Sequence, residues 1–137
     1  MRITAFTDYS LRTLMFVAQA PEGHTTVADA ARGLAVSENH LVKVVHALGA
    51  LGMLRNLRGR GGGISLATSP ASINVGRVVR LSETLNIAEC FDAESNTCAL
   101  AGRCRLEGVF HEALDAFLEV LDRYTLEDLM KWKIPLQ

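Results

Sequence analysis

Three cysteines are the residues of this 137-residue chain whose type and spacing could support metal or redox chemistry. Cys90, Cys98 and Cys104 all lie in one segment, ECFDAESNTCALAGRCRLEG, at the spacing C-x7-C-x5-C. The N-terminus lacks the basic and apolar stretches of a secretion signal, and an odd number of clustered thiols fits a disulfide framework poorly. We therefore predict a metal or redox site, and the alternative is three unrelated cysteines.

The spacing of the thiols also bears on the kind of metal site. Thiolates bind both zinc and iron-sulfur clusters, so the softness of the ligand does not distinguish them. A structural zinc site usually takes pairs of cysteines at C-x2-C spacing, and this sequence has no such pair. Gaps of seven and five residues suit a larger group, an iron-sulfur cluster bound by an open loop. Ala99 and Gly102 would allow the chain to wrap around this cluster. Three cysteines would leave one iron of a cubane without a thiolate.

Several helices must position this segment, and the first three form a predicted helix-turn-helix. Thr7, Thr26 and Ser37 can cap successive helices, and the second of these ends at Gly33, where a left-handed residue is easily accommodated. The third helix, ENHLVKVVHALGAL, carries a stripe of apolar residues at helical spacing. Because a connection of about three or four residues joins the second helix to the third, the pattern is typical of a helix-turn-helix.

A β-hairpin follows the third helix. Two β-prone runs, residues 53–57 and 64–67, flank RGRGGG, which is too rich in glycine to be anything but a turn. A hairpin in this position is the wing of a winged helix. Asn74 can cap a further helix that runs to about Leu85.

The end of the chain is predicted to be helical again. From Leu106 to about Asp122, apolar residues recur on one face at a near-heptad spacing, which predicts a helix that packs against a partner. Thr125 and Asp128 resemble a capping box before a short last helix. The predicted fold class is mainly α with a small β wing, divided into a winged helix-turn-helix (1–85), a cysteine loop (86–105), and a long dimerisation helix with a short C-terminal helix (106–137).

The charge is distributed unevenly along the chain. Residues 1–80 carry nine Lys and Arg against four Asp and Glu, a balance of +5, whereas the remainder carries five against eleven, a balance of -6. A basic N-terminal half favours a nucleic-acid reader, although a solvated face can show the same bias. No run approaches the roughly 18 apolar residues needed to span a bilayer, so we expect a soluble cytoplasmic protein.

The predicted winged helix places candidate DNA contacts on the third helix and on the wing. The start of such a helix enters the major groove, where Asn and His can read base edges, while Lys and Arg bind phosphates. The candidates are Ser37, Asn39, His40, Lys43, Arg55, Arg58 and Arg60.

Two other classes of function are open. RGRGGG could cradle a phosphorylated small molecule, but no Lys-Ser/Thr follows the glycines and the next helix starts too far away. An enzyme or electron carrier would use the cluster for redox work, but no catalytic set of Ser, His and Asp or of Cys and His accompanies the thiols at a plausible spacing. We therefore do not expect an enzyme.

The sequence as a whole resembles the family of winged-helix iron-sulfur regulators, and within it the repressors that sense nitric oxide. The matching segments are MRITAFTDYSLRTLMFVA, SENHLVKVVHALGALG, RGRGGGISLA, INVGRVVRLSE and ECFD…NTC…GRCRLEG…AFLEVLDRYTLEDL. The resemblance implies a homodimer that binds operator DNA while each subunit carries one cluster, of the 4Fe-4S type, and that releases the DNA when nitric oxide reacts with the cluster. A regulator of the same fold that carries another cluster, or that uses its thiols without a cluster, is the alternative.

The resemblance also implies the ligands of this cluster. Cys90, Cys98 and Cys104 match the three cluster cysteines, and Asp8 matches a fourth ligand that the other subunit supplies. The alternative for Asp8 is a first-turn carboxylate favoured by the helix dipole and paired with Arg12. Members of the family with a 2Fe-2S cluster have a histidine three residues after the last cysteine, where this chain has Glu107.

Overall fold

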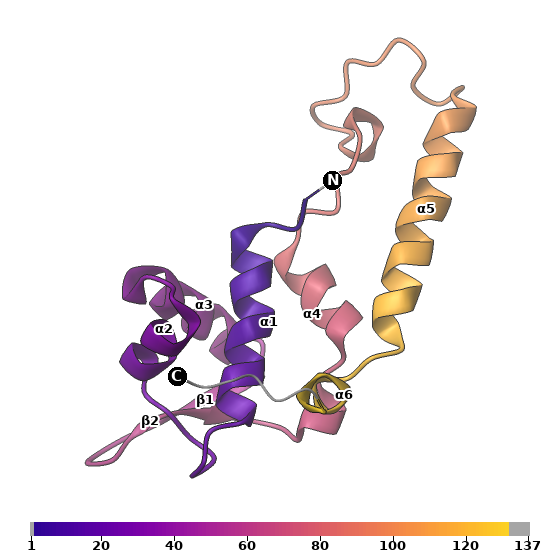
Figure 1. The fold of residues 1–137 in the computed structure, drawn as a ribbon. Helices are drawn as coiled ribbons and strands as arrows, with labels where there is room; N and C mark the ends of the chain where they lie inside the picture. The colour runs from indigo at the N-terminus through magenta and orange to yellow at the C-terminus, as the bar shows by residue number, and fades with distance from the viewer. Residues whose placement is uncertain (1, 132–137) are drawn as a thin grey trace.

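The protein is a winged helix with a long helix appended. The computed structural model describes residues 2–131, and the last six residues of the predicted C-terminal region lie outside this range. The elements in chain order are α1 (Ala5–Ala18), α2 (Val27–Leu34), α3 (Glu38–Ala50), β1 (Leu54–Leu57), β2 (Gly63–Leu66), η1 (Pro70–Ser72), α4 (Val75–Ser82), η2 (Glu89–Phe91), α5 (Arg105–Asp122) and α6 (Leu126–Met130) (Figure 1). The predicted fold class, mainly α with a small two-stranded wing, is confirmed.

One hydrophobic core holds the winged helix together. Helix α1 lies against α2, α3 and β2, and its Leu14 and Val17 are almost completely buried. Leu41 and Leu48 of α3 meet them from the other side, as the apolar stripe of this helix predicted. Within residues 2–131, no helix is both long enough and apolar enough to cross a membrane.

Of the caps predicted at Thr7, Thr26, Ser37 and Asn74, three are confirmed and one is wrong. Thr26, Ser37 and Asn74 each accept a hydrogen bond from a backbone N–H in the first turn of the helix that follows. Helix α1 is capped by Thr4 and begins at Ala5, so Thr7 is not its cap. The Thr7 side chain is completely buried and its hydroxyl donates to Ser82 Oγ at 2.9 Å, which ties α1 to α4.

The role predicted for Gly33 is also wrong. Gly33 lies inside α2, and the left-handed residue that ends this helix is Ala35, with φ 53°. A Cβ atom on Gly33 would overlap the ring of Phe16. Glycine is therefore needed here because α1 and α2 approach each other closely, and not because the chain turns.

The wing is an antiparallel hairpin that extends away from the helices (Figure 1). Arg55 pairs with Ser65 in its register, and Thr25, from the connection before α2, adds a bridge to Ile64. Backbone hydrogen bonds join Thr25 and Ile64 in both directions, at 3.0 and 2.7 Å. The wing is thus fixed at its base by a third segment of chain.

Helix α5 packs on the winged helix through α4. Val79 of α4 and Leu114 and Leu118 of α5 form a second, smaller buried cluster. Other apolar side chains of the predicted face, including Val109, are exposed in the single chain. The predicted capping box is confirmed, since Thr125 and Asp128 exchange hydrogen bonds at the start of α6.

We predict that Gly63→Ala destabilises the fold. A Cβ atom at this position would overlap the carbonyl oxygen of Thr25, which accepts the hydrogen bond from Ile64. Forcing an atom into such a contact costs about 1–3 kcal/mol. Urea unfolding at a fixed protein concentration measures the change in the free energy of unfolding.

Gly49→Ala is the matched control for this substitution. Gly49 lies within α3, where an added Cβ would make only ordinary van der Waals contact. Alanine is the better helix former, so this variant should be as stable as the parent or more stable. Equal loss of stability in both variants would contradict the close approach of Gly63 and Thr25.

Candidate DNA-binding surface and cysteine pocket

The predicted DNA-binding residues of α3 lie on its exposed face. Asn39, His40 and Lys43 are all exposed. Ser37 is the cap, and its hydroxyl accepts the His40 N–H at 3.3 Å and lies 2.8 Å from His40 Nδ1. The start of α3 is therefore held in place by its own polar side chains.

Two residues of this face were missed by the sequence prediction. Val42, with 51% of its surface exposed, and His46 lie three and seven positions after Asn39, on the same side of the helix as Lys43. Their spacing was the available signal, because residues i, i+3, i+4 and i+7 share one face. An exposed apolar side chain between polar ones can contact a thymine methyl group in the major groove.

The three wing arginines differ in how they are held. Arg55 Nε donates to Ser65 Oγ at 3.0 Å, across the two strands, so this side chain is directed by the sheet. Arg58 and Arg60 are exposed in the turn between the strands. Gly59 and Gly61, which alternate with them, have φ of 91° and 75°, a left-handed backbone that glycine adopts without strain. The turn therefore presents two cations at the tip of the hairpin.

The three cysteines line one pocket of about 220 Å³. Cys90 lies in the short helix η2, Cys98 in the loop that follows, and Cys104 directly before α5. The remaining lining residues are Ala88, Glu89, Leu100, Leu106, Glu107 and Phe110. The sequence prediction missed Glu89 and Glu107 as lining residues, although each is close to a cysteine in the chain.

The size of this pocket fits a group larger than one ion. A single water needs only about 15 Å³ of such space, far less than the pocket offers. Within residues 2–131, no three Cys, His, Asp or Glu side chains are close enough to hold a single metal ion. Three thiols around a wide pocket with mainly apolar walls suit the thiolate ligation of an iron-sulfur cluster.

Hydrogen bonds shape the loop that carries the first two cysteines. Asn96 Oδ1 accepts the Cys98 N–H at 2.9 Å, and the Asp92 carboxylate accepts bonds from Ser95 Oγ and the Glu94 N–H. The bond from Ser95 is the main reason that the pKa of Asp92 is lowered. The ring of Phe91 stacks on His111 of α5, with the ring centres 4.1 Å apart. The loop is thereby connected to α5.

Asp8 is not among the residues of the cysteine pocket. It lies in the first turn of α1, and its carboxylate forms an ion pair with Arg12, one turn later. This bond is the main reason that the pKa of Arg12 is raised, and the guanidinium also lies 5.3 Å from the centre of the Tyr9 ring. The structure therefore does not bring Asp8 to the thiols of its own chain.

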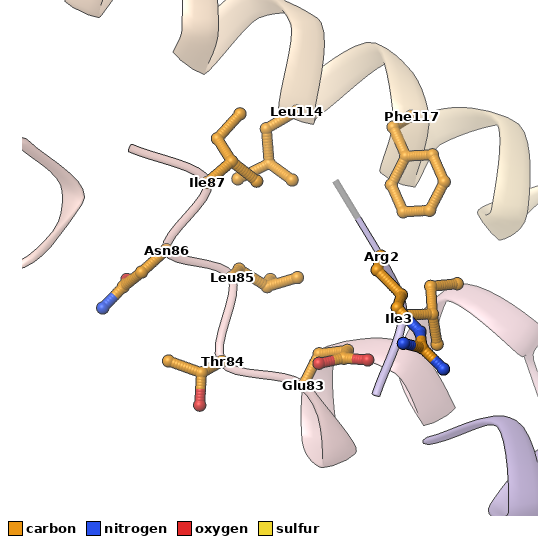
Figure 2. A pocket seen from close by; sticks show the side chains of 9 residues that line it. All are labelled: Arg2, Ile3, Glu83, Thr84, Leu85, Asn86, Ile87, Leu114 and Phe117. Carbon is orange, nitrogen blue, oxygen red and sulfur yellow. The ribbon is translucent and has the colours of Figure 1, made fainter. Parts of the chain in front are cut away.

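The N-terminal segment lies beside the stretch that leads to the cysteines. Arg2 and Ile3 face Leu85 across a pocket of about 170 Å³ (Figure 2). Leu114 and Phe117 of α5 line a third side of this pocket. The Thr4 N–H donates to Glu83 Oε1 at 2.5 Å. The start of α1 and the cysteine loop thus lie at the same end of the molecule, away from the wing (Figure 1).

Comparisons with known proteins agree with this arrangement. The family model of Rrf2, described as an iron-dependent transcriptional regulator, matches residues 3–132. The chain is 49% identical over 135 residues to the HTH-type transcriptional regulator NsrR of Bacillus subtilis, covering 97% of this chain and 92% of that protein. It is 48% identical over 132 residues to the NsrR of Shouchella clausii, covering 95% and 89%.

Solved structures show the same fold. The global cysteine regulator CymR of B. subtilis matches with a TM-score of 0.79 and 26% identity, over 98% of this chain and 99% of that one. The IscR of T. potens matches with a TM-score of 0.79 and 24% identity, over 96% and 87%.

The match to the family model and the identity to the curated relatives each extend over nearly the whole chain. The resemblance found in the sequence is thereby confirmed, and with it the expectation that the protein is not an enzyme. The chain is a helix-turn-helix transcriptional regulator, and it belongs to the Rrf2 family of iron-dependent transcriptional regulators.

Proposed function

We propose that this protein is a homodimeric repressor whose binding to operator DNA depends on a 4Fe-4S cluster that reacts with nitric oxide. The observation that carries the proposal is the single pocket lined by Cys90, Cys98 and Cys104 at the start of α5. The high identity to regulators named NsrR supports it. A thiol regulator without a cluster is the second candidate, because the three cysteines around this pocket are free thiols that could react without a metal.

The residues proposed to hold the cluster come from two subunits. Cys90, Cys98 and Cys104 would bind three of its irons, and Asp8 of the partner subunit would bind the fourth. The bound cluster would supply iron atoms that nitric oxide can attack, and a carboxylate is a harder ligand for iron than a thiolate. Within its own chain this carboxylate is held by the ion pair with Arg12, one turn later on α1.

The residues of the chain itself connect the pocket to the DNA-binding elements. Cys104 directly precedes α5, and Phe91 stacks on His111, so the position of the cysteine loop bears on the position of this helix. Helix α5 packs on α4, and α4 packs on α1 of the winged helix. Since two half-sites on DNA require a fixed separation of two recognition helices, a small shift of α5 in a dimer would weaken binding at both halves together.

The proposed dimer would use the free side of α5. Leu106, Val109 and Val120 have about half of their surface exposed in the single chain. Apolar side chains repeated along one helix favour a helical partner, and a second copy of α5 would bury them. Helix α5 is therefore the proposed dimerisation helix.

We predict that anaerobically purified protein is brown and contains about four irons and four sulfides per subunit, as expected for one 4Fe-4S cluster in each. Nitric oxide should abolish its binding to operator DNA but leave binding to random DNA largely unchanged, because the interactions with phosphates persist. Visible spectra, iron and sulfide counts and gel-shift titrations measure this. Colourless protein with full operator affinity would exclude the cluster proposal.

The proposed DNA-binding residues divide into two kinds, and the division is testable. Arg60→Ala should remove one interaction with a phosphate, weaken binding to all sequences, and lower the salt slope by about 1. Asn39→Ala and His40→Ala should relax sequence choice instead, at about 1–3 kcal/mol for each hydrogen bond to a base that is removed. Fluorescence titrations on operator and random DNA at several salt concentrations separate the two effects.

Arg123→Ala is the control for the loss of positive charge, because Arg123 is exposed but follows α5, outside α3 and the wing. Its affinity and salt slope should match those of the parent. The division of roles would be wrong if the Arg60, Asn39 and His40 variants all showed the same decrease in affinity for operator and random DNA.

The role of Asp8 can be separated from that of its ion pair. Asp8→Ala should leave a cluster on three thiolates but weaken operator binding, whereas Cys98→Ala should abolish stable cluster binding. Asp8→Cys should slow the first reaction with nitric oxide, because a thiolate is a softer ligand for iron. Stopped-flow absorbance and gel-shift assays measure these effects.

Arg12→Gln is the matched control, because it removes the same ion pair and keeps the carboxylate. If Asp8 is a ligand, Asp8→Ala should change the visible spectrum and the rate of reaction with nitric oxide more than Arg12→Gln does, each compared with the parent. Identical behaviour of Arg12→Gln and Asp8→Ala would assign Asp8 to the ion pair alone.

A further inference from the structure

One carboxylate closes the loop between the first two cysteines. Glu89 Oε1 accepts a hydrogen bond from the Thr97 N–H and another from Thr97 Oγ1, both at 2.6 Å. The hydroxyl bond is the first cause, and the backbone bond the second, of the lowered pKa of Glu89. Glu89 directly precedes Cys90 and Thr97 directly precedes Cys98. The contact between Glu89 and Thr97 therefore brings Cys90 and Cys98 toward each other.

Within residues 2–131, no other hydrogen bond of this loop spans so many residues. The bonds of Asp92 and Asn96, and the backbone bonds at Phe91, Ala101 and Arg103, join residues at most three apart in the described segment. Glu89 and Thr97 are separated by eight positions. Local turns shape the course of the loop, but they do not fix the distance between its ends.

We propose that Glu89 is a positioning residue that sets the separation of Cys90 and Cys98 before any group binds to them. A carboxylate suits this role because hydrogen bonds to a charged acceptor are shorter and stronger than neutral ones. Without the contact, none of the hydrogen bonds described for residues 2–131 joins Glu89 and Thr97, and bringing these two ends of the loop together costs the entropy of closing a flexible chain. The inference rests on the proposed function only for the identity of the group that the thiols hold.

The position of this contact makes it accessible to mutation. Glu89 and Thr97 are exposed, and neither belongs to the two buried clusters of the fold. Replacing them should leave the winged helix folded. A change in the behaviour of the thiols then reports on the loop and not on global unfolding.

The first test uses metal-free protein in the Cys104→Ser background, equilibrated with reduced and oxidised glutathione. Cys90 and Cys98 form a disulfide by losing two electrons and two protons, and one oxidised glutathione is reduced to two glutathione thiols. The equilibrium gives the effective concentration of one thiol at the other. Glu89→Ala should lower this effective concentration about three- to tenfold, because it removes two charge-assisted hydrogen bonds.

Three further variants control this result. Glu89→Gln keeps an oxygen that can accept both bonds, so it should recover most of the loss. Thr97→Val keeps only the backbone donor and should fall between the parent and Glu89→Ala. Glu94→Ala removes an exposed carboxylate from the same loop and should match the parent. In parallel, hydrogen exchange of the Thr97 amide should be faster in Glu89→Ala only.

A second test uses the full cysteine set, reconstituted with iron and sulfide under anaerobic conditions. The cluster of Glu89→Ala should be lost to a chelator faster than those of the parent and of Glu94→Ala. Suppose that Glu89→Ala lowers the effective concentration of the thiols, but that neither the parent nor any variant takes up iron and sulfide. The positioning role then stands and the cluster proposal fails. If Glu89→Ala and Glu94→Ala show the same effective concentration and the same Thr97 exchange, the positioning role is overturned.

Discussion

The junction between α4 and the end of α5 decides how the cysteine end of the molecule is placed relative to the DNA-binding elements. Arg80 donates two hydrogen bonds to Asp122, at 2.5 and 2.7 Å, and Asn74 Nδ2 donates to the Asp122 carbonyl at 2.8 Å. A Cβ atom on Gly76 would overlap the Asp122 carboxylate, so the ion pair in this position lies in space that the glycine leaves free. The ion pair is partly exposed and adds little stability, because water screens it. Its two parallel hydrogen bonds fix the orientation of the end of α5 relative to α4. The buried contacts of Val79 with α5 stabilise the packing of these two helices.

Much of this fold could be predicted from local sequence signals. The caps at Thr26, Ser37, Asn74 and Thr125 were correct because a side-chain oxygen before a helix satisfies a free N–H whatever surrounds it. The cap predicted at Thr7 was wrong because Thr4, about one turn earlier, has the same side-chain hydroxyl and caps the helix instead. Gly33 is required because the Phe16 ring, which is distant in the sequence, lies against it in space. A local sequence pattern cannot reveal such a contact. Helix α4 ends at Ser82, before the predicted Leu85, because the next residues extend toward α5 instead.

The candidate site was predictable to a different extent. The clustering of three thiols is visible in the chain, whereas their common pocket depends on how the loop folds against the start of α5. Glu89 could not be singled out from the sequence, because its partner Thr97 is one of several polar residues in the segment. The proposed ligand role of Asp8 involves a second subunit, so neither the sequence pattern nor one chain can place it. The roles of the cysteines and of the DNA-binding residues stay predictions.

The contact of Phe16 with Gly33 has a mechanical consequence for α1. An aromatic ring that lies on bare backbone leaves no room for the two helices to slide along each other. Helix α1 carries Asp8 in its first turn and Phe16 in its last, and α2 is the helix that precedes the turn to α3. A displacement of α1 would therefore have to carry α2 with it or open the contact between Phe16 and Gly33.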